Sequence, residues 1–197
     1  EAIHSSTVKT IFIGGGTPSF LEPKLLKKLF KSLEAFSATV DEFSIENNPN
    51  SLDEEKLKLY QDSGVTRLSL GVQSFDENEL KFLERVHDKQ KAHQAIRLAE
   101  KYYPGKWNAD LIYALPEQEL KTFANSLKEL LEHDPQHVSC YELTYENETP
   151  LGQDLKKGKI KALEDEAILN CQNLAQETFA QRGLDRYEVS NYAKKGF

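Results

Sequence analysis

The sequence of 197 residues has no methionine, one tryptophan and only two cysteines, Cys140 and Cys171. The cysteines form neither a CxxC pair nor a cluster with the spacing of metal ligands, and both lie in apolar patterns. We therefore expect two buried free thiols, which suit the reducing cytoplasm. The start at Glu1 and the lack of methionine indicate a fragment of a longer protein. A second interpretation is that methionines were replaced by a non-standard residue that the letters omit.

Long apolar runs are also absent, and none approaches the roughly 20 residues of a membrane-spanning helix. Nothing resembles a signal peptide, so we expect no transmembrane segment. The net charge of -7 argues against a nucleic-acid-binding surface. The phosphate-binding patterns GxGxxG and GxxxxGK[ST] are missing, which makes a nucleotide-phosphate site a poor expectation. What remains is a globular domain with an ordinary share of apolar residues.

Strand-like and helix-like segments alternate along the chain. The expected strands are 11–13, 42–46, 65–72, 108–114 and 137–143, with a short one at 186–190. The expected helices are 23–36, 51–64, 76–86, 89–103, 120–132 and 164–182, and 145–158 is expected to be a loop. Ser51 with Glu54, and Asp76 with Glu79, have the spacing of helix-capping pairs. The alternation is typical of parallel βα units, and its period fits a doubly wound sheet and a TIM-type barrel equally.

Residues with hydrogen-bonding groups lie on or directly after each of the first five expected strands. They are Gly14, Gly15, Gly16 and Thr17; Glu46, Asn47, Asn48 and Pro49; Gln73 and Ser74; Asp110 and Tyr113; and Tyr141, Glu142 and Thr144. Ligands of parallel α/β folds bind beyond the carboxyl ends of the strands, so these residues predict a polar ligand site. The alternative for the glycines alone is a tight turn between a strand and a helix.

The residue types at these ends suit a ligand with hydroxyl groups and an amino-acid end. Glu46 and Asp110 carry carboxylates that accept hydrogen bonds from ribose hydroxyls. Arg85 has a guanidinium that binds a carboxylate in a bidentate fork, although a surface arginine at a helix end is equally consistent with its position. Backbone carbonyls after the glycines could accept hydrogen bonds from an ammonium group.

Seven ordered stretches resemble one known family. They are IFIGGGTPS at 11–19, ENNP at 46–49, RLSLGVQSF at 67–75, RVH at 85–87, DLIYALP at 110–116, YELTYE at 141–146 and YEVSNYA at 187–193. Together they resemble the radical S-adenosylmethionine proteins that include oxygen-independent coproporphyrinogen III oxidase and the heme chaperone HemW. The stretches 141–146 and 187–193 resemble the heme chaperone branch, and the oxidase carries different residues at both places.

The resemblance implies an α/β fold, a partial (β/α)6 TIM-type barrel, whose first βα unit is missing from this chain. It implies a barrel part at 1–145 and the start of a C-terminal extension at 146–197. It also implies an S-adenosylmethionine site. Its residues would be Gly15, Gly16, Thr17, Glu46, Gln73, Arg85, Asp110 and Thr144. The expected cofactors are S-adenosylmethionine, a [4Fe–4S] cluster in the full-length form and heme, with heme or porphyrin and a heme-acceptor protein as partners.

The chain departs from the family pattern in three respects. The CxxxCxxC motif that holds the cluster is absent, so no residue of this chain is expected to ligate metal. The H-N-x-x-Y-W stretch of the chaperone branch would follow Phe197. Ala114 and Glu117 stand where glycines are common, which leaves the shape of that turn open. The alternatives to a heme chaperone are coproporphyrinogen decarboxylation, another radical enzyme and a non-catalytic binding module, and no catalytic residue is assigned.

Overall fold

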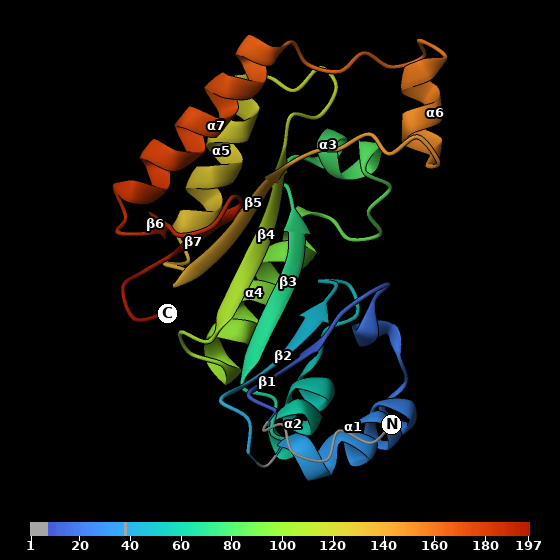
Figure 1. Ribbon diagram of the computed structural model, residues 1–197, viewed down its shortest axis with the longest axis vertical. Helices are drawn as coiled ribbons and strands as arrows, with labels where there is room; N and C mark the ends of the chain where they lie inside the picture. The colour runs from blue at the N-terminus through green and yellow to red at the C-terminus, as the bar shows by residue number, and fades with distance from the viewer. Residues whose placement is uncertain (1–7, 38) are drawn as a thin grey trace. The chain divides into compact units, whose positions relative to one another are not determined.

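A computed structural model describes residues 8–37 and 39–197, and strands and helices alternate along them (Figure 1). The strands are β1 (Thr10–Ile13), β2 (Glu42–Asn47), β3 (Arg67–Gln73), β4 (Trp107–Tyr113), β5 (His137–Glu142), β6 (Asp185–Arg186) and β7 (Asn191–Ala193). The helices are the 3-10 turn η1 (Pro18–Phe20), α1 (Pro23–Ser37), α2 (Glu54–Asp62), α3 (Glu77–Phe82), α4 (Lys89–Tyr102), α5 (Leu120–Leu131), α6 (Pro150–Lys156) and α7 (Asp165–Ala180).

The chain divides into two compact units. The first extends to Gly71 and includes Gln90–Trp107, and the second comprises Val72–Lys89 and Asn108–Phe197. The division between 1–145 and 146–197 that the family resemblance implies remains a prediction.

In the first unit, β1, β2 and the Arg67–Gly71 part of β3 are parallel neighbours in that order. Apolar residues four positions apart on α1 place Leu26 and Phe30 on one face of the helix, and both are buried. The Phe30 ring meets Phe43 of β2 and Tyr60 of α2 edge to face, with ring centres 6.0 and 5.7 Å apart. This aromatic cluster packs the two helices on the sheet and leaves the opposite face to Glu42, Ser44 and Glu46.

The ends of α2 follow from local chemistry. Asp53 is the N-cap, and its Oδ1 accepts a hydrogen bond from the amide of Lys56 across 2.8 Å. Gly64, with a φ of 83°, ends the helix in the left-handed conformation that glycine adopts without strain. The predicted capping role of Ser51 is therefore wrong, because Asp53 supplies the oxygen that satisfies the first turn.

In the second unit, β4 and β5 are parallel, and β7 pairs antiparallel with β5 and with β6. Apolar faces of α5 and α7 pack against each other, and the two helices lie side by side in Figure 1. Phe179 of α7 contacts Tyr192 of β7, with ring centres 4.7 Å apart. Cys140 of β5 and Cys171 of α7 are buried free thiols, as predicted.

Two predicted segments differ from the structure. The expected loop at 145–158 contains α6, because the Thr149 hydroxyl caps the helix by accepting from the Gly152 amide and Pro150 opens it. Of the expected strand at 186–190, only Arg186 lies in a strand, as the last residue of β6, and the rest forms the turn to β7. In that turn Arg186 Nη2 donates to the carbonyl of Val189 across 2.6 Å. Strands of two or three residues are too short to show an alternating pattern.

The only tryptophan of the sequence, Trp107, begins β4 and is 3% exposed. It belongs to the first unit. Among the residues that the structure describes, no helix combines the length and the apolar character that crossing a membrane requires.

Candidate ligand site

The glycine loop after β1 is shaped by the absence of side chains. A Cβ atom on Gly14 would lie 2.5 Å from the Phe12 ring and 2.9 Å from the Glu46 carboxyl carbon. Gly15 and Gly16 have φ values of 81° and 62°, which other residues adopt only with strain. The amide of Gly15 donates to Glu46 Oε2 across 3.1 Å. Because this donor already binds the carboxylate, the carbonyls of the loop are the groups best suited to meet a cationic ligand.

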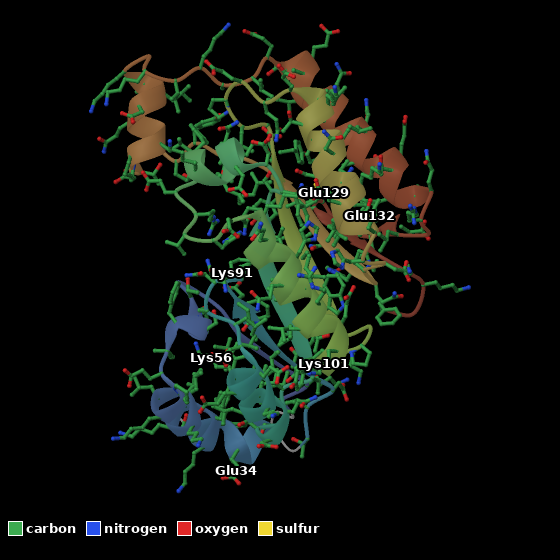
Figure 2. All side chains as sticks on the ribbon, turned by 180° about the vertical axis from the view of Figure 1, so that it is seen from behind. Glu34, Lys56, Lys91, Lys101, Glu129 and Glu132 are labelled. Atoms are coloured by element: carbon green, nitrogen blue, oxygen red, sulfur yellow. The ribbon has the colours of Figure 1, made fainter. Side chains whose placement is uncertain are left out.

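A buried serine joins the glycine loop to the loop after β2. Ser19 is fully buried, and its Oγ accepts a hydrogen bond from the Asn48 amide at 2.9 Å and lies 2.6 Å from Ser51 Oγ. The Lys56 ammonium (Figure 2) donates to the carbonyls of Ser19 and Ser51 at 2.6 and 2.7 Å. These bonds hold the segment after Thr17 against the segment after Glu46, so the two predicted site segments of the first unit have one fixed arrangement.

In the second unit, Gln73 ends β3 in a left-handed backbone conformation with a φ of 69°. It is 4% exposed, and its Oε1 accepts a hydrogen bond from the Tyr141 hydroxyl of β5 across 3.1 Å. The preceding carbonyl, that of Val72, lies 3.0 Å from His87 Nε2. Burial lowers the pKa of His87, and the positive charge of Arg85 lowers it further. The end of β3 is therefore held through both its backbone and its last side chain.

Arg85 and Asp110 also belong to the second unit. Arg85 is partly buried, and its buried Nε has no hydrogen-bond partner among the described residues. Buried guanidinium nitrogens are normally satisfied, so this nitrogen suits an anionic group of a ligand. Asp110 lies inside β4, and its Oδ1 accepts from Asn108 Nδ2 across 3.0 Å.

Thr17 and Thr144 are the two remaining residues of the predicted site. Thr17 precedes η1 without a capping hydrogen bond from its side chain, and Thr144 is exposed after β5. The structure thus brings Gly15 and Glu46 of the predicted site into contact. It also gives Gln73 a hydrogen-bond partner, Tyr141, to which the sequence analysis assigned no role beyond its place at a strand end.

Sequence analysis missed a buried hydrogen-bond network around the Glu79 carboxyl group, in the segments that follow β3 and β4. Glu79 accepts hydrogen bonds from Ser74 Oγ and, at 2.9 Å, from Gln118 Nε2. Gln118 Oε1 accepts from the Ala114 amide across 2.8 Å, and Ser126 Oγ accepts from the Phe75 amide across 3.1 Å. Burial raises the pKa of Glu79, and the two hydrogen bonds that it accepts oppose that effect.

This network corrects the predicted role of Glu79. Asp76 alone caps α3, by accepting from the amides of Asn78 and Glu79, while the Glu79 side chain points into the unit. A hollow of about 320 Å³ borders Glu79 between α3 and the segment before α5. The spacing Asp-x-x-Glu is shared by capping pairs and gave no signal of a buried acid.

The turn after β4 adopts glycine-like geometry without glycine. Ala114 and Glu117 have φ values of 65° and 59°, in the left-handed region. The turn at which sequence analysis left the shape open therefore keeps the conformation that glycine favours, at a cost in backbone strain.

Neither cysteine is suited to bind a metal or a cluster. Burial raises the pKa of both thiols, so the thiolate form that ligates iron is disfavoured. Within the described residues no group of three or more His, Cys, Asp or Glu side chains is placed to hold a metal ion. The described residues, 8–37 and 39–197, therefore do not fit a [4Fe–4S] cluster.

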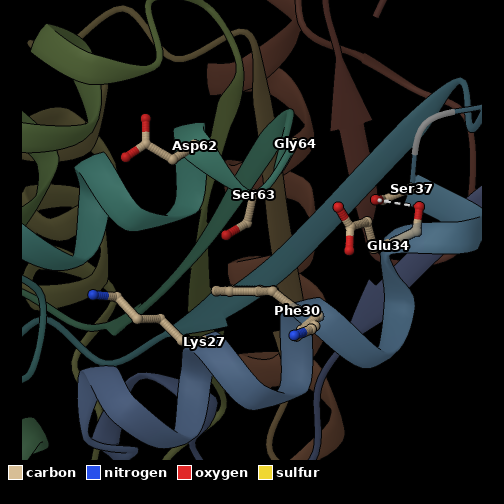
Figure 3. Close-up of a pocket in the computed structure, with 8 residues that line it drawn as sticks. Lys27, Phe30, Glu34, Ser37, Asp62, Ser63 and Gly64 are labelled. Atoms are coloured by element: carbon tan, nitrogen blue, oxygen red, sulfur yellow. Dashed lines mark hydrogen bonds between the residues drawn. The ribbon is translucent and has the colours of Figure 1, made fainter.

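A separate hollow of about 410 Å³ lies between α1 and the end of α2 (Figure 3). Lys27 and Glu34 of α1 line it on one side and Asp62 on the other, with Phe30 at its floor. It contains none of the predicted site residues, and its mixed charges select no class of ligand.

Comparison with known proteins identifies the family of the chain. The family model of the radical SAM superfamily matches residues 1–130. The heme chaperone HemW of Escherichia coli is 37% identical over 193 residues, which covers 96% of this chain and 50% of that protein. The heme chaperone HemW of Bacillus subtilis is 35% identical over 192 residues, 96% of this chain and 51% of that protein. The chain thus spans about half the length of these curated relatives.

Solved structures with the same fold include coproporphyrinogen III oxidase (HemN) from E. coli, described as a radical SAM enzyme. Its TM-score is 0.83 at 25% identity, over 96% of this chain and 44% of that one. The archaeal Elp3 of Methanocaldococcus infernus aligns with a TM-score of 0.72 at 22% identity, over 86% of this chain and 45% of that one. The predicted α/β fold of the radical SAM type is confirmed, and the chain carries part of it. The protein belongs to the radical SAM superfamily.

Proposed function

We propose that the protein binds S-adenosylmethionine and acts in heme trafficking as a heme chaperone. One observation carries the heme chaperone proposal: similarity to two curated heme chaperones extends over 96% of this chain at 35 and 37% identity. Because the chain spans about half of those relatives, heme binding is assigned to the full-length protein, with heme or a porphyrin as cargo and a heme-acceptor protein as partner. We place the protein in the cytoplasm.

The proposed contacts of S-adenosylmethionine in the first unit come from the glycine loop. The carbonyls near Gly15 and Gly16 accept hydrogen bonds from the ligand ammonium, and Thr17 closes the loop. Glu46, whose carboxylate already accepts from the Gly15 amide, adds negative charge beside that ammonium. The fixed Ser19 network supports the proposal, because a loop that is held in one shape loses little entropy on binding.

The proposed contacts in the second unit come from Gln73, Arg85, Asp110 and Thr144. The unpartnered Nε of Arg85 supports an ion pair with the ligand carboxylate. Asp110 would accept hydrogen bonds from ribose hydroxyls, and Thr144 would contribute its own hydroxyl. A [4Fe–4S] cluster in the full-length protein would supply reducing power beside this site, and none of its ligands is assigned to a residue of this chain.

Heme titration tests the chaperone proposal. Hemin is added to the full-length protein, with and without a reconstituted cluster, and the Soret band is followed against the same additions to buffer. A saturable shift of the band at a stoichiometric ratio is the expected result. A band that stays identical to free hemin throughout the titration rejects heme binding.

The second candidate is oxygen-independent oxidation of coproporphyrinogen III, and the structural likeness to the E. coli oxidase favours it. Oxidative decarboxylation would convert a propionate side chain of the porphyrinogen into a vinyl group with loss of carbon dioxide, one hydrogen atom and one electron. S-adenosylmethionine would supply the group that takes up the hydrogen atom, and an added one-electron acceptor would take the electron. Anaerobic incubation of the reconstituted full-length protein with substrate, S-adenosylmethionine, a reductant for the cluster and that acceptor, followed by mass analysis, distinguishes the two functions. Vinyl products would identify an oxidase. Unchanged substrate would reject the oxidase function and favour the heme chaperone proposal.

A further inference from the structure

The last residue of β3 has an unusual backbone conformation for its type. Gln73 adopts a left-handed φ of 69° although it carries a side chain, which strains the backbone relative to an ordinary conformation. Such strain persists only where the surroundings fix the residue, and it is common at ligand sites. The hydrogen bonds around Gln73 therefore indicate its function at the site.

The backbone on both sides of Gln73 is fixed by hydrogen bonds within the second unit. The Val72 carbonyl accepts from the Ser74 amide at 2.9 Å and lies 3.0 Å from His87 Nε2. The Phe75 amide donates to Ser126 Oγ at 3.1 Å. These bonds determine where the Gln73 side chain begins, but they leave the rotation of its amide group open.

Tyr141 fixes that rotation. Its hydroxyl donates to Gln73 Oε1 across 3.1 Å, and the two residues are 68 positions apart in the sequence. A glutamine amide has an oxygen that accepts and an NH₂ group that donates, and the two ends have nearly the same shape. In this arrangement the oxygen faces the phenol, which leaves the NH₂ group as the end that can donate to a ligand.

The position of Tyr141 on its strand agrees with a role at the ligand site. In the register of β4 and β5, Asp110 is opposite Ser139, and Ile112 is opposite Tyr141. Residues two apart on a strand share a face, so Tyr141 is on the same face of this sheet as Asp110. Cys140, on the other face, is buried, and Tyr141 is only half-buried.

We propose that Tyr141 is a positioning residue that holds the amide of Gln73 with its NH₂ group toward the ligand, so that Gln73 recognises a hydrogen-bond acceptor of S-adenosylmethionine. This inference rests on the proposed S-adenosylmethionine site. It adds Tyr141 to that site and states that Gln73 acts there as a hydrogen-bond donor. A Gln73 that is free to rotate would present donor and acceptor in turn and would discriminate less between ligands.

The test measures S-adenosylmethionine affinity by calorimetry in the reconstituted full-length protein. Tyr141→Phe removes only the hydroxyl, and the expected result is an affinity about 3- to 12-fold lower, the equivalent of one net hydrogen bond. Tyr145→Phe is the matched control, because its hydroxyl is buried without a partner among the described residues, and it should leave affinity unchanged. Thermal unfolding of both variants reports any loss of stability.

A double-mutant cycle separates positioning from a structural role. If Tyr141 acts through Gln73, Tyr141→Phe should have no further effect on affinity in a Gln73→Ala background. An equal loss in both backgrounds overturns the inference, as does wild-type affinity in Tyr141→Phe. If Tyr141→Phe fails to fold, Gln73→Glu decides: it keeps an oxygen for the phenol but removes the donor, so affinity should fall at least about tenfold, and unchanged affinity refutes the inference. Absence of binding by the wild-type protein would instead reject the proposed S-adenosylmethionine site.

Discussion

The amide of Gly15 donates to the Glu46 carboxylate across 3.1 Å, although 31 residues separate the two along the chain. The bond joins the loop after β1 to the end of β2. At position 14 of this loop the surrounding atoms leave room for glycine but not for a residue with a Cβ atom. A Cβ atom on Gly14 would overlap the Phe12 ring and crowd the carboxyl group of Glu46.

Gly14→Ala should therefore weaken S-adenosylmethionine binding by about tenfold or more, because either Phe12 or Glu46 must move. Calorimetry on the reconstituted full-length protein measures the change. Gly158→Ala is the matched control: its φ of 67° makes alanine strained, but no atom lies within 4 Å of the added Cβ. The control should lose stability and keep its affinity; equal affinities in the two variants would contradict the expectation.

Ser19→Ala should destabilise the protein by about 1–3 kcal/mol, because the buried amide of Asn48 loses its acceptor. The hydroxyl of Ser51 loses its contact with Ser19 and keeps its bond to the Asn48 carbonyl. Urea unfolding measures the change. Ser32→Ala is the comparison, since the exposed Ser32 hydroxyl bonds only the Leu29 carbonyl of its own helix. That variant should lie within about 0.5 kcal/mol of the wild type. A loss no larger in Ser19→Ala would show that the network contributes little.

Glu117→Gly should stabilise the protein by about 0.5–1 kcal/mol. Glycine relieves the strain of a φ of 59°, and the added freedom of the unfolded chain offsets part of that gain. Glu119→Gly, two residues later at a φ of -83°, relieves nothing and should be neutral or slightly destabilising. Chemical denaturation of both variants provides the test. A destabilised Glu117→Gly variant would mean that the Glu117 carboxylate stabilises the fold by more than the backbone strain at this position costs.

His87 should make stability depend on pH. Its pKa is lower in the folded protein than in the unfolded chain, so the unfolded chain binds a proton first as the pH falls. The contribution is complete above the unfolded value of about 6.5 and is lost as the pH falls through the folded value, with a slope of at most about 1.4 kcal/mol per pH unit. The hydrogen bond to the Val72 carbonyl raises the pKa of His87, as do Asp88 and Glu77, and these contributions reduce the effect.

Melting temperatures between pH 8 and pH 5 measure this dependence. His87→Gln keeps a donor for the Val72 carbonyl and should give a flatter profile than the wild type. Val86→Ala, an exposed neighbour, should retain the wild-type slope. Parallel profiles for the wild type and His87→Gln would contradict the role of His87.

Much of the fold was predictable from sequence because its helices have amphipathic periodicity. The predicted helix 23–36 is α1 (Pro23–Ser37), and the predicted strand 137–143 is β5 (His137–Glu142). α6 was not predicted, because a helix of seven residues in a polar stretch has no apolar stripe to identify it. Its start, Thr149 followed by Pro150, was the signal available.

The site could be predicted only in part. The ends of parallel strands share an edge, and this rule selected Glu46, Gln73 and Asp110 as candidates. Partners such as Tyr141 for Gln73, or Lys56 for the Ser19 carbonyl, depend on tertiary packing between segments 68 and 37 residues apart. No local pattern encodes such pairs, and the buried Glu79 looked like an ordinary capping residue for the same reason.

The single buried Trp107 has a spectroscopic consequence. Tryptophan emission from this chain originates entirely in the first unit, whereas the eight tyrosines are distributed along the sequence. Selective excitation of the indole would therefore follow changes around the start of β4, and far-ultraviolet circular dichroism would follow both units. Coincident transitions from the two signals would show that the units melt as one cooperative system, and separated transitions would give each unit its own stability.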